Sequence, residues 1–352
     1  MSLCPPDHNR LQRFWGRADD LSIPLIVHWD LTFDCNYRCK HCYLSCHDAA
    51  GDLTTDEVVR ILDELAAAGT LYLVWSGGEA LLRPDFFELA AEARKREFAL
   101  RVYTNGSLIS PQVADELAAL NLLAVDVSLY GASAETHDAV TRSPGSFERA
   151  LRAARLLRER GVHVGIKSPL LREVLGEFEA LARLADQVGD EWTFDPLIVG
   201  TAENRRPTRD YCLRGEDLRR LYASPRFDGM EPHPLWDQND PVCGAGRTLA
   251  YIAPDGTVKP CVTVPVSGGN LRQQSFQAIW RKAPVFREMR QANIGCLEKC
   301  VSCEYAGFCG PCPAMAYVEQ GDFWAPADSM CMLAQARYMA WMARQQAEET
   351  AS

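Results

Sequence analysis

The sequence predicts an α/β fold, a partial (β/α)6 TIM-like barrel followed by a smaller cysteine-rich domain. From Ile23 to about Ile198, short β-branched or apolar runs alternate with longer amphipathic stretches, which is typical of a parallel sheet. Nine of the fourteen cysteines lie at or after Cys212, among Gly- and Pro-rich turns. The 352 residues, 47% of them hydrophobic, suffice for one large domain and one smaller domain.

Six strands are expected in the barrel, with helices between them. The strands are Leu25–Thr32, Leu71–Ser76, Leu100–Thr104, Ala124–Leu129, His163–Ser168 and Trp192–Ile198. Capping signals predict helices at Asp56–Ala68 after Thr54 or Thr55, at Asp85–Arg96 beginning with Pro84, at Gln112–Leu120 after Ser110-Pro111, and at Phe147–Arg160 between Ser146 and Gly161. Six βα units without a seventh or eighth indicate an open barrel, whose chemistry should lie on the loops at the strand carboxyl ends.

Composition divides the remaining chain. We expect an N-terminal extension at 1–22, the barrel at 23–200, a polar bridge at 201–242, the cysteine-rich domain at 243–333 and a C-terminal helix at 334–352. The bridge contains one predicted helix near Glu216–Tyr222. The closing stretch Met332–Glu348 reads as helical, with an apolar stripe typical of core packing.

Charge and hydropathy limit the partners and the compartment. The net charge of −10 argues against a general nucleic-acid binder. The N-terminus lacks the apolar region of a signal peptide, and no run approaches the roughly 18 apolar residues of a membrane span. We therefore expect a cytoplasmic protein whose cysteines bind metal rather than form disulfides.

Three cysteines follow the first predicted strand, at Cys35, Cys39 and Cys42, with Tyr43 next. This spacing suits three thiolates on one iron–sulfur cluster and leaves a fourth iron without a cysteine ligand. Such an iron can bind and reduce a substrate or cofactor. A zinc site that adds Cys46 is the alternative, because C-x2-C pairs are common in zinc ribbons.

The next strands also end in residues suited to ligand binding. Strand two leads to Gly77-Gly78-Glu79, where glycines permit close backbone approach and the carboxylate can receive an ammonium group. Strand three leads to Thr104-Asn105-Gly106, which a plain tight turn would also explain. Ser128 lies at the end of strand four, and Arg142 follows with a planar guanidinium that can bind a carboxylate through two hydrogen bonds.

Asp195, in Phe194-Asp195-Pro196 at the end of strand six, is a candidate proton acceptor or substrate anchor. The same residue could instead cap a turn through Pro196.

The Cys35-x3-Cys39-x2-Cys42-Tyr43 motif and the loops after it resemble those of the radical S-adenosylmethionine (SAM) enzymes. The resemblance implies a [4Fe–4S] cluster on the three cysteines, with SAM at its open iron. It implies that Gly77, Gly78 and Glu79 bind the methionine moiety, with Tyr43, Thr104 and Asn105 near the cofactor. It further assigns Ser128 to the ribose and Arg142 to the SAM carboxylate. Enzymes of this family cleave SAM reductively to a 5′-deoxyadenosyl radical, which abstracts a hydrogen atom from the substrate.

The C-terminal cysteines resemble the SPASM extension, named for subtilosin, pyrroloquinoline quinone, anaerobic sulfatase and mycofactocin maturation. That resemblance implies two auxiliary iron–sulfur clusters. The outer cluster would take Cys300, Cys303, Cys309 and Cys331, and the inner cluster Cys243, Cys261 and Cys312. The inner set is one ligand short, so Cys212 or Cys296 completes it or the iron is open to substrate.

Most SPASM enzymes modify ribosomally made peptides by crosslinking or oxidation, so a peptide or protein maturase with a flavodoxin- or ferredoxin-type electron donor is our leading hypothesis. Only about 24 residues precede the first strand, too few for a winged helix, so leader-peptide recognition would need a separate protein or direct contact with the barrel.

Two other functions stay open. One is oxidative decarboxylation of a small cofactor precursor such as a haem-type tetrapyrrole, whose propionates would need a cation such as Arg172, Lys167 or Arg205-Arg206. Solvated surface charge is the more common explanation of such residues. The other is an electron-transfer or scaffold protein without catalysis, against which Gly77-Gly78-Glu79 and Ser128 argue.

Overall fold

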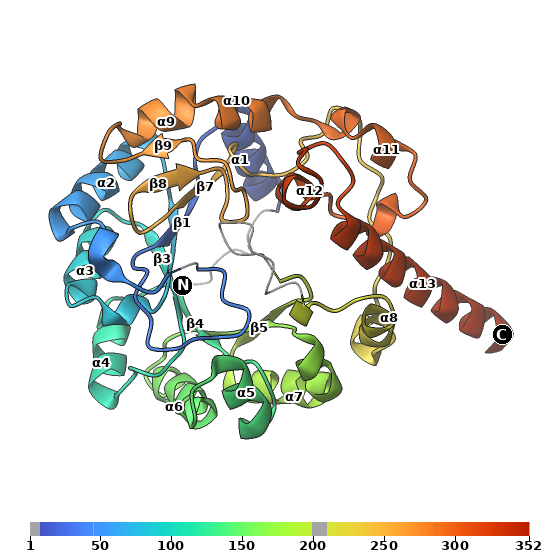
Figure 1. The fold of residues 1–352 in the computed structure, drawn as a ribbon, viewed down its shortest axis with the longest axis horizontal. Helices are drawn as coiled ribbons and strands as arrows, with labels where there is room; N and C mark the ends of the chain where they lie inside the picture. Colours follow the sequence, from blue (N-terminus) through green and yellow to red (C-terminus); the bar gives the residue numbers. More distant parts are fainter. Residues whose placement is uncertain (1–7, 45, 199–209, 352) are drawn as a thin grey trace.

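In the computed structural model, residues 8–44, 46–198 and 210–351 are described. The described residues form one nine-stranded sheet in the order β6-β5-β4-β3-β2-β1-β7-β8-β9 (Figure 1). Neighbouring strands from β6 across to β7 are parallel, and β7, β8 and β9 are antiparallel. The strands are β1 Ile26–Asp30, β2 Tyr72–Ser76, β3 Ala99–Thr104, β4 Ala124–Ser128, β5 Val164–Pro169, β6 Glu191–Asp195, β7 Leu249–Ile252, β8 Thr257–Lys259 and β9 Gly269–Asn270. The consecutive parallel order of β1 to β6 confirms the predicted partial barrel.

Helices cover the outer side of this sheet. Figure 1 shows α2, α3, α4, α6 and α7 on an arc around the strands, which α9 and α10 continue. The described α-helices are α1 His8–Asp20, α2 Thr55–Ala68, α3 Phe86–Lys95, α4 Pro111–Ala119, α5 Ala134–Thr141, α6 Ser146–Arg158, α7 Phe178–Val188, α8 Glu216–Tyr222, α9 Phe276–Lys282, α10 Pro284–Gln291, α11 Glu298–Val301, α12 Pro313–Gln320 and α13 Asp328–Ala351. Among the described residues, none of these helices is long and apolar enough to cross a bilayer.

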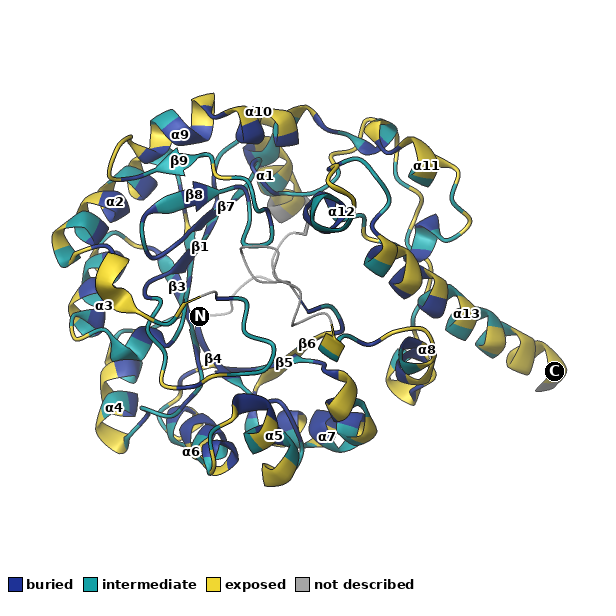
Figure 2. Ribbon diagram, viewed as in Figure 1, coloured by how far each residue is buried: buried dark blue, intermediate teal, exposed yellow. Residues whose placement is uncertain are grey.

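The main core lies between the helices and the sheet. In α2, the buried residues Val58, Ile61, Leu62 and Leu65 recur at helical spacing and so form one apolar face. The same division is visible in Figure 2, where helix surfaces that face the sheet are buried and the outer surfaces are exposed. This packing holds the strands rigidly, so their carboxyl ends form a fixed platform for the loops.

Local capping explains where the barrel helices begin. The hydroxyls of Thr54 and Ser110 accept hydrogen bonds from the first turns of α2 and α4, as expected. Ser146 is not the cap of α6, however. It is the first residue of that helix, and the carboxylate of Asp138 in α5 accepts hydrogen bonds from Gly145 N and Phe147 N instead. A carboxylate beside two unpaired backbone N–H groups satisfies them better than a serine already inside the helix.

The C-terminal region joins the barrel through an unpredicted seventh parallel strand. Strand β7 pairs with the free edge of β1, with Val27 opposite Ala250 and Trp29 opposite Ile252. The sheet therefore continues from the barrel into the cysteine-rich region. Pairing of strands more than 200 residues apart leaves no local pattern in the sequence.

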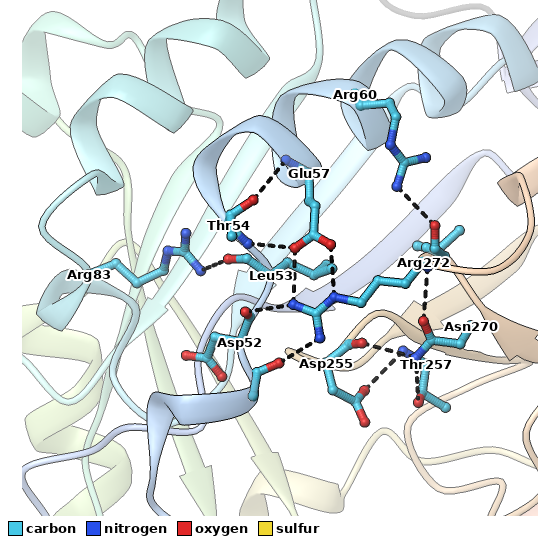
Figure 3. A network of polar contacts seen from close by, with 12 residues as sticks. Asp52, Leu53, Thr54, Glu57, Arg60, Arg83, Asp255, Thr257, Asn270 and Arg272 are labelled. Carbon is cyan, nitrogen blue, oxygen red and sulfur yellow. Dashed lines mark hydrogen bonds and ion pairs between the residues drawn. The ribbon is translucent and has the colours of Figure 1, made fainter.

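A network of charged groups fastens this junction (Figure 3). Arg272, after β9, donates to both carboxylate oxygens of Glu57 on α2, at 2.8 and 3.0 Å. It also donates to the carbonyls of Gly51 and Asp52 at 3.1 and 2.9 Å. The hydrogen bonds from Arg272 lower the pKa of Glu57 to about 2, so the pair stays ionised at neutral pH.

Element ends differ slightly from expectation. Strand β6 ends at Asp195 rather than Ile198, because Pro196 has no N–H for the ladder. Helix α13 begins at Asp328 rather than Met332, so Cys331 lies in its first turn. Arg205 and Arg206 lie outside the described residues. The proposed domain boundaries remain predictions.

Candidate active site

A cavity of about 280 Å³ lies beside the carboxyl ends of the barrel strands. Nine of the predicted site residues line it, whereas Glu79, Arg142 and Asp195 do not. The full lining is His28, Cys35, Tyr37, Cys39, His41, Cys42, Tyr43, Ser76, Gly77, Gly78, Tyr103, Thr104, Asn105, Asp126, Ser128, Tyr130, Lys167, Pro169 and Val262. A larger depression of about 650 Å³ between α6 and α7 contains none of the predicted residues, so we place the chemistry in the cavity.

The three thiols after β1 gather at this cavity. Burial, with a smaller contribution from the charge of Cys42, raises the pKa of Cys35 to about 11 and the pKa of Cys39 to about 12. Thiols this close repel one another as thiolates, so they ionise only when bound to positively charged iron. Cluster binding should therefore release protons. This donor set fits an iron–sulfur cluster.

The described residues give no geometric support to the alternative zinc site, in which Cys46 would join Cys35, Cys39 and Cys42. Cys46 is exposed and does not line the cavity, and the Cys42 thiol instead lies 3.6 Å from His47 Nε2. In the described part of the chain, no three His, Cys, Asp or Glu side chains are arranged to hold a single ion.

The two glycines after β2 bring their loop against the cysteine loop. Gly78 N donates to Thr32 O and Glu79 N donates to Asp34 O, both at 2.8 Å. A Cβ on Gly78 would lie 1.9 Å from Asp34 O, and Gly77 has φ of 124°. The sequence suggested close approach to a ligand. In the structure, the close neighbour is the backbone just before Cys35, so the glycines position both loops together.

Glu79 is fully buried behind the cavity wall. Its carboxylate accepts hydrogen bonds from Thr104 Oγ1 at 2.8 Å and Asn105 N at 2.7 Å, and both residues line the cavity. Burial raises the pKa of Glu79 to about 7. A cationic group in the cavity would stabilise the charged carboxylate, which fits the predicted ammonium partner.

Ser128 and Arg142 differ in placement. Ser128 ends β4 and lines the cavity. Arg142 ends α5 in the left-handed conformation, is exposed, and lies near enough to lower the pKa of Cys39. Its assignment to the SAM carboxylate stays a prediction.

Asp195 caps a turn, as the alternative for this residue proposed. Its Oδ1 accepts a hydrogen bond from Leu197 N at 2.8 Å. Burial raises the pKa of Asp195, and the charges of Lys167 and Arg337 oppose that rise. Its own charge acts on the Cys312 thiol, so it lies between the barrel and the C-terminal cysteines. A catalytic role for Asp195 remains a prediction.

Electrostatic interactions among the C-terminal cysteines join them in two sets, whose roles as cluster ligands stay predictions. In the first set, the pKa of Cys309 is raised to about 12. Burial is the largest cause, and the charges of Cys331, Cys300 and Cys303 add to it.

In the second set, burial raises the pKa of Cys243 to about 11, and the charges of Cys261 and Cys312 contribute to this rise. Cys212 Sγ lies 3.9 Å from Ile198 O, and the exposed Cys296 lies 3.5 Å from Asn293 Oδ1. The fourth ligand of the inner set stays open.

Sequence reasoning missed a set of polar residues on the strands themselves. His28, Tyr103 and Asp126 line the cavity from β1, β3 and β4, and Lys167, considered only for one alternative substrate, lines it from β5. Behind them, the fully buried Asp30 accepts hydrogen bonds from Tyr43 and Tyr251 at 2.8 and 2.6 Å. The available signal was a polar residue at alternate positions in an apolar strand.

These features define an enzyme of the radical SAM class: a three-cysteine loop and a Gly-Gly-Glu loop share one cavity, and two further cysteine groups lie in the C-terminal region. Comparison with known proteins supports this class. Residues 29–185 match the radical SAM superfamily model, and residues 243–304 match the SPASM model, described as an iron–sulfur cluster-binding domain.

Relatives extend over most of the chain. An AdoMet-dependent heme synthase of Methanosarcina barkeri is 32% identical over 329 residues, covering 85% of this chain and 94% of the relative. The mycofactocin maturase MftC of Mycobacterium ulcerans is 32% identical over 315 residues, covering 83% and 81%. Among solved structures, native anSMEcpe with bound AdoMet has a TM-score of 0.67 at 16% identity, covering 93% and 100%. Streptococcus suis SuiB bound to precursor peptide SuiA has a TM-score of 0.66 at 18% identity, covering 94% and 82%.

The chain therefore belongs to the radical SAM superfamily and carries a SPASM domain. It is an enzyme whose cofactors are SAM, a [4Fe–4S] cluster and auxiliary iron–sulfur clusters.

Proposed function

We propose that this enzyme is a maturase that abstracts a hydrogen atom from a peptide or protein substrate and thereby starts a crosslink or an oxidation. The observation that carries the proposal is that Val262, next to the SPASM cysteine Cys261, lines the cavity, while the β1–β7 pair joins the two regions in one sheet. A relative named as a maturase and a similar fold bound to a precursor peptide support this substrate class.

The residues of the chain would divide the work as follows. Cys35, Cys39 and Cys42 would hold the first cluster, and Glu79 would stabilise the SAM ammonium from behind Thr104 and Asn105. When bound, SAM and the cluster supply the radical that removes hydrogen from carbon. The aromatic lining of the cavity would exclude water and orient the substrate carbon.

The outer and inner cysteine groups would hold two auxiliary clusters that accept an electron from the substrate. An electron donor of the flavodoxin or ferredoxin type would supply the first cluster. We keep a separate leader-peptide-recognition protein as a proposed partner.

A second candidate function is modification of a tetrapyrrole carboxylate. Lys167 favours it, because this lysine lines the cavity rather than the protein surface. Arg172 does not share that position, since it pairs with Asp217 at 3.0 Å. A heme synthase among the relatives is consistent with this alternative.

The test is anaerobic turnover with dithionite and SAM. Peptides encoded beside the gene and iron-coproporphyrin III would be supplied separately, and 5′-deoxyadenosine and substrate mass would be measured. Loss of hydrogen or a new crosslink in a peptide supports the maturase, and loss of carbon dioxide from the porphyrin supports the alternative. A Cys42→Ala variant is the control, because it should produce neither product. Release of no 5′-deoxyadenosine by the parent enzyme under any condition contradicts both.

A further inference from the structure

Lys167 is a cation inside the cavity that forms no ion pair with a described residue, although its charge acts on the Asp195 carboxylate. It is half-buried on β5, and its Nζ lies 4.7 Å from the centre of the Tyr103 ring. None of the ion pairs between described residues includes it. By contrast, Asp126, the acidic residue of the cavity lining, is paired with Arg101 through a 2.7 Å hydrogen bond, and Arg101 also pairs with Glu191. Lys167 is therefore the cation of the cavity lining, and it forms no ion pair with a described residue.

His28 lies beside Lys167 against the same aromatic ring. The rings of His28 and Tyr103 meet edge to face, with centroids 5.7 Å apart. The His28 Nε2 atom is buried and has no hydrogen-bond partner; its distance to Asp30 Oδ1 is 3.7 Å. Lys167 and the His28 imidazole thus line the same part of the cavity, and Asp30 lies on the Nε2 side of the imidazole.

The same cavity extends from the first-cluster cysteines toward the C-terminal cysteines, because Val262, next to Cys261, also lines it. The cations whose charges act on the cluster thiols are Arg38 and Arg142. Lys167 acts instead on His28 and on Asp195, which neighbours the SPASM cysteine Cys312. Lys167 therefore lines a cavity that it shares with the first-cluster cysteines, and its charge reaches Asp195, which neighbours Cys312.

We propose that Lys167, assisted by His28, binds a carboxylate of the substrate, so that the enzyme acts on a molecule with a free carboxylate close to the reacting carbon. This inference rests on the proposed function and narrows its substrate class. The carboxylate comes either from a peptide, as a chain terminus or acidic side chain, or from a propionate of a tetrapyrrole.

The physical reason is the cost of leaving an ammonium group unpaired in a largely apolar cavity. Pro169 and Val262 line the same space and reduce its polarity. In such surroundings a carboxylate forms a stronger, charge-assisted hydrogen bond with lysine than it does in water. The imidazole of His28 can donate a second hydrogen bond to the same anion.

Equilibrium binding without reductant tests this directly, because no turnover is then required. The probes are coproporphyrin III with its tetramethyl ester, and a pool of linear pentapeptides with free or amidated carboxyl termini. SAM-loaded, cluster-loaded enzyme is titrated with each probe, using porphyrin fluorescence or affinity-selection mass spectrometry. The variants are Lys167→Met, Lys167→Arg and, as a matched control on the exposed end of α9, Lys282→Met.

We expect one free-acid probe to bind at least about tenfold more tightly than its neutral form, as loss of a charged hydrogen bond implies. Lys167→Met should abolish that difference, whereas Lys167→Arg and Lys282→Met should retain it. SAM affinity and iron content should be unchanged in all three variants. A porphyrin-selective or a peptide-selective response identifies the source of the carboxylate.

Several results overturn the inference. These are equal binding of acid and neutral probes, binding of neither acid, parent-like acid binding by Lys167→Met, or a matching loss of SAM affinity in that variant. The last outcome would assign Lys167 to the cofactor. Failure here is separate from failure of the proposed function, which reductive turnover and product mass test independently.

Discussion

Burial controls the chemistry of single residues in this site. The Glu79 carboxylate has three hydrogen-bond donors, yet burial still raises its pKa to about 7. A carboxyl group whose pKa is raised on folding destabilises the folded protein increasingly as the pH rises from its unfolded pKa through its folded pKa. The protein without SAM therefore bears this cost in full above about pH 7, and a bound ammonium group would remove it.

The pH dependence of SAM binding should reveal this coupling. Because the ammonium group favours the ionised carboxylate, SAM binding should expel a proton below about pH 7 and weaken by up to about tenfold per pH unit there. Glu79→Gln should flatten the profile and cost about 1.5 to 3 kcal/mol of SAM binding at pH 8. Equilibrium dialysis from pH 6 to 8, about one unit either side of the Glu79 pKa, measures this. The exposed Glu88→Gln is the control, and an unchanged profile in Glu79→Gln would exclude the assigned role.

A methyl group at Gly78 should disrupt the cysteine loop. The new Cβ would lie 1.9 Å from Asp34 O, so one of the two loops must move. We expect Gly78→Ala to lose about four irons per chain, one [4Fe–4S] cluster, and to lose SAM binding with it. Gly176→Ala is a matched control, because nothing lies within 4 Å of its Cβ position. Parent-like iron content in Gly78→Ala would show that the loops do not depend on this contact.

The sequence predicted residues on motif loops and at strand ends, but it did not identify His28, Tyr103 or Asp126 within the strands. Cys35, Gly78 and Ser128 belong to short local patterns that sit at strand ends. His28 and Lys167 reach the cavity only because the strands curve into a barrel, and that curvature decides which face of each strand is enclosed. Alternation of polar residues in an apolar strand shows that they share one face, but it does not show that this face lines a cavity.

Helix starts were predicted correctly where the capping residue directly precedes the helix in sequence. Thr54 and Ser110 precede their helices directly and cap them as predicted. The α6 cap failed as a prediction because Asp138 reaches it from the preceding helix, a short helix that the sequence analysis did not identify.

Removing this cap should destabilise α6 selectively. Asp138→Ala leaves Gly145 N and Phe147 N without their acceptor and should lower the free energy of unfolding by about 1 to 2 kcal/mol. Chemical denaturation followed by circular dichroism measures the loss. Arg152→Ala, exposed on the same helix, should change stability by less than about 0.5 kcal/mol. Equal effects of the two substitutions would contradict the capping role of Asp138.

At the scale of the whole molecule, the chain order of the barrel was predictable, but its junction with the SPASM domain was not. The alternation of apolar and amphipathic segments in the sequence predicts the order of β1 to β6. The β1–β7 pair, in contrast, joins segments that are remote in sequence. The division of the C-terminal cysteines into two cluster-binding groups came from the resemblance to the SPASM extension, and their roles as ligands stay predictions.

Iron content should report all three cysteine groups. Anaerobically reconstituted enzyme should contain about twelve irons per chain, as three [4Fe–4S] clusters require. Replacing Cys35, Cys39 and Cys42 together with Ala should remove about four irons and leave the auxiliary EPR signals in place. The same substitution at Cys300, Cys303 and Cys309 is the matched comparison. A parent enzyme with about four irons would refute the assignment of two auxiliary clusters.

Strand β1 has a hydrogen-bonded neighbour on each edge, β2 from the barrel and β7 from the SPASM domain. The SPASM domain is therefore not a detachable module. A chimera that exchanges it between relatives must preserve the interlocking of Val27 and Trp29 with their β7 partners, or it will expose an apolar strand edge prone to aggregation. The continuous sheet also joins the region that would hold the first cluster to the region that would hold the auxiliary clusters, without a hinge between them. The distance for electron tunnelling between these clusters should therefore stay constant. We expect the rate of electron transfer between them to be insensitive to solvent viscosity.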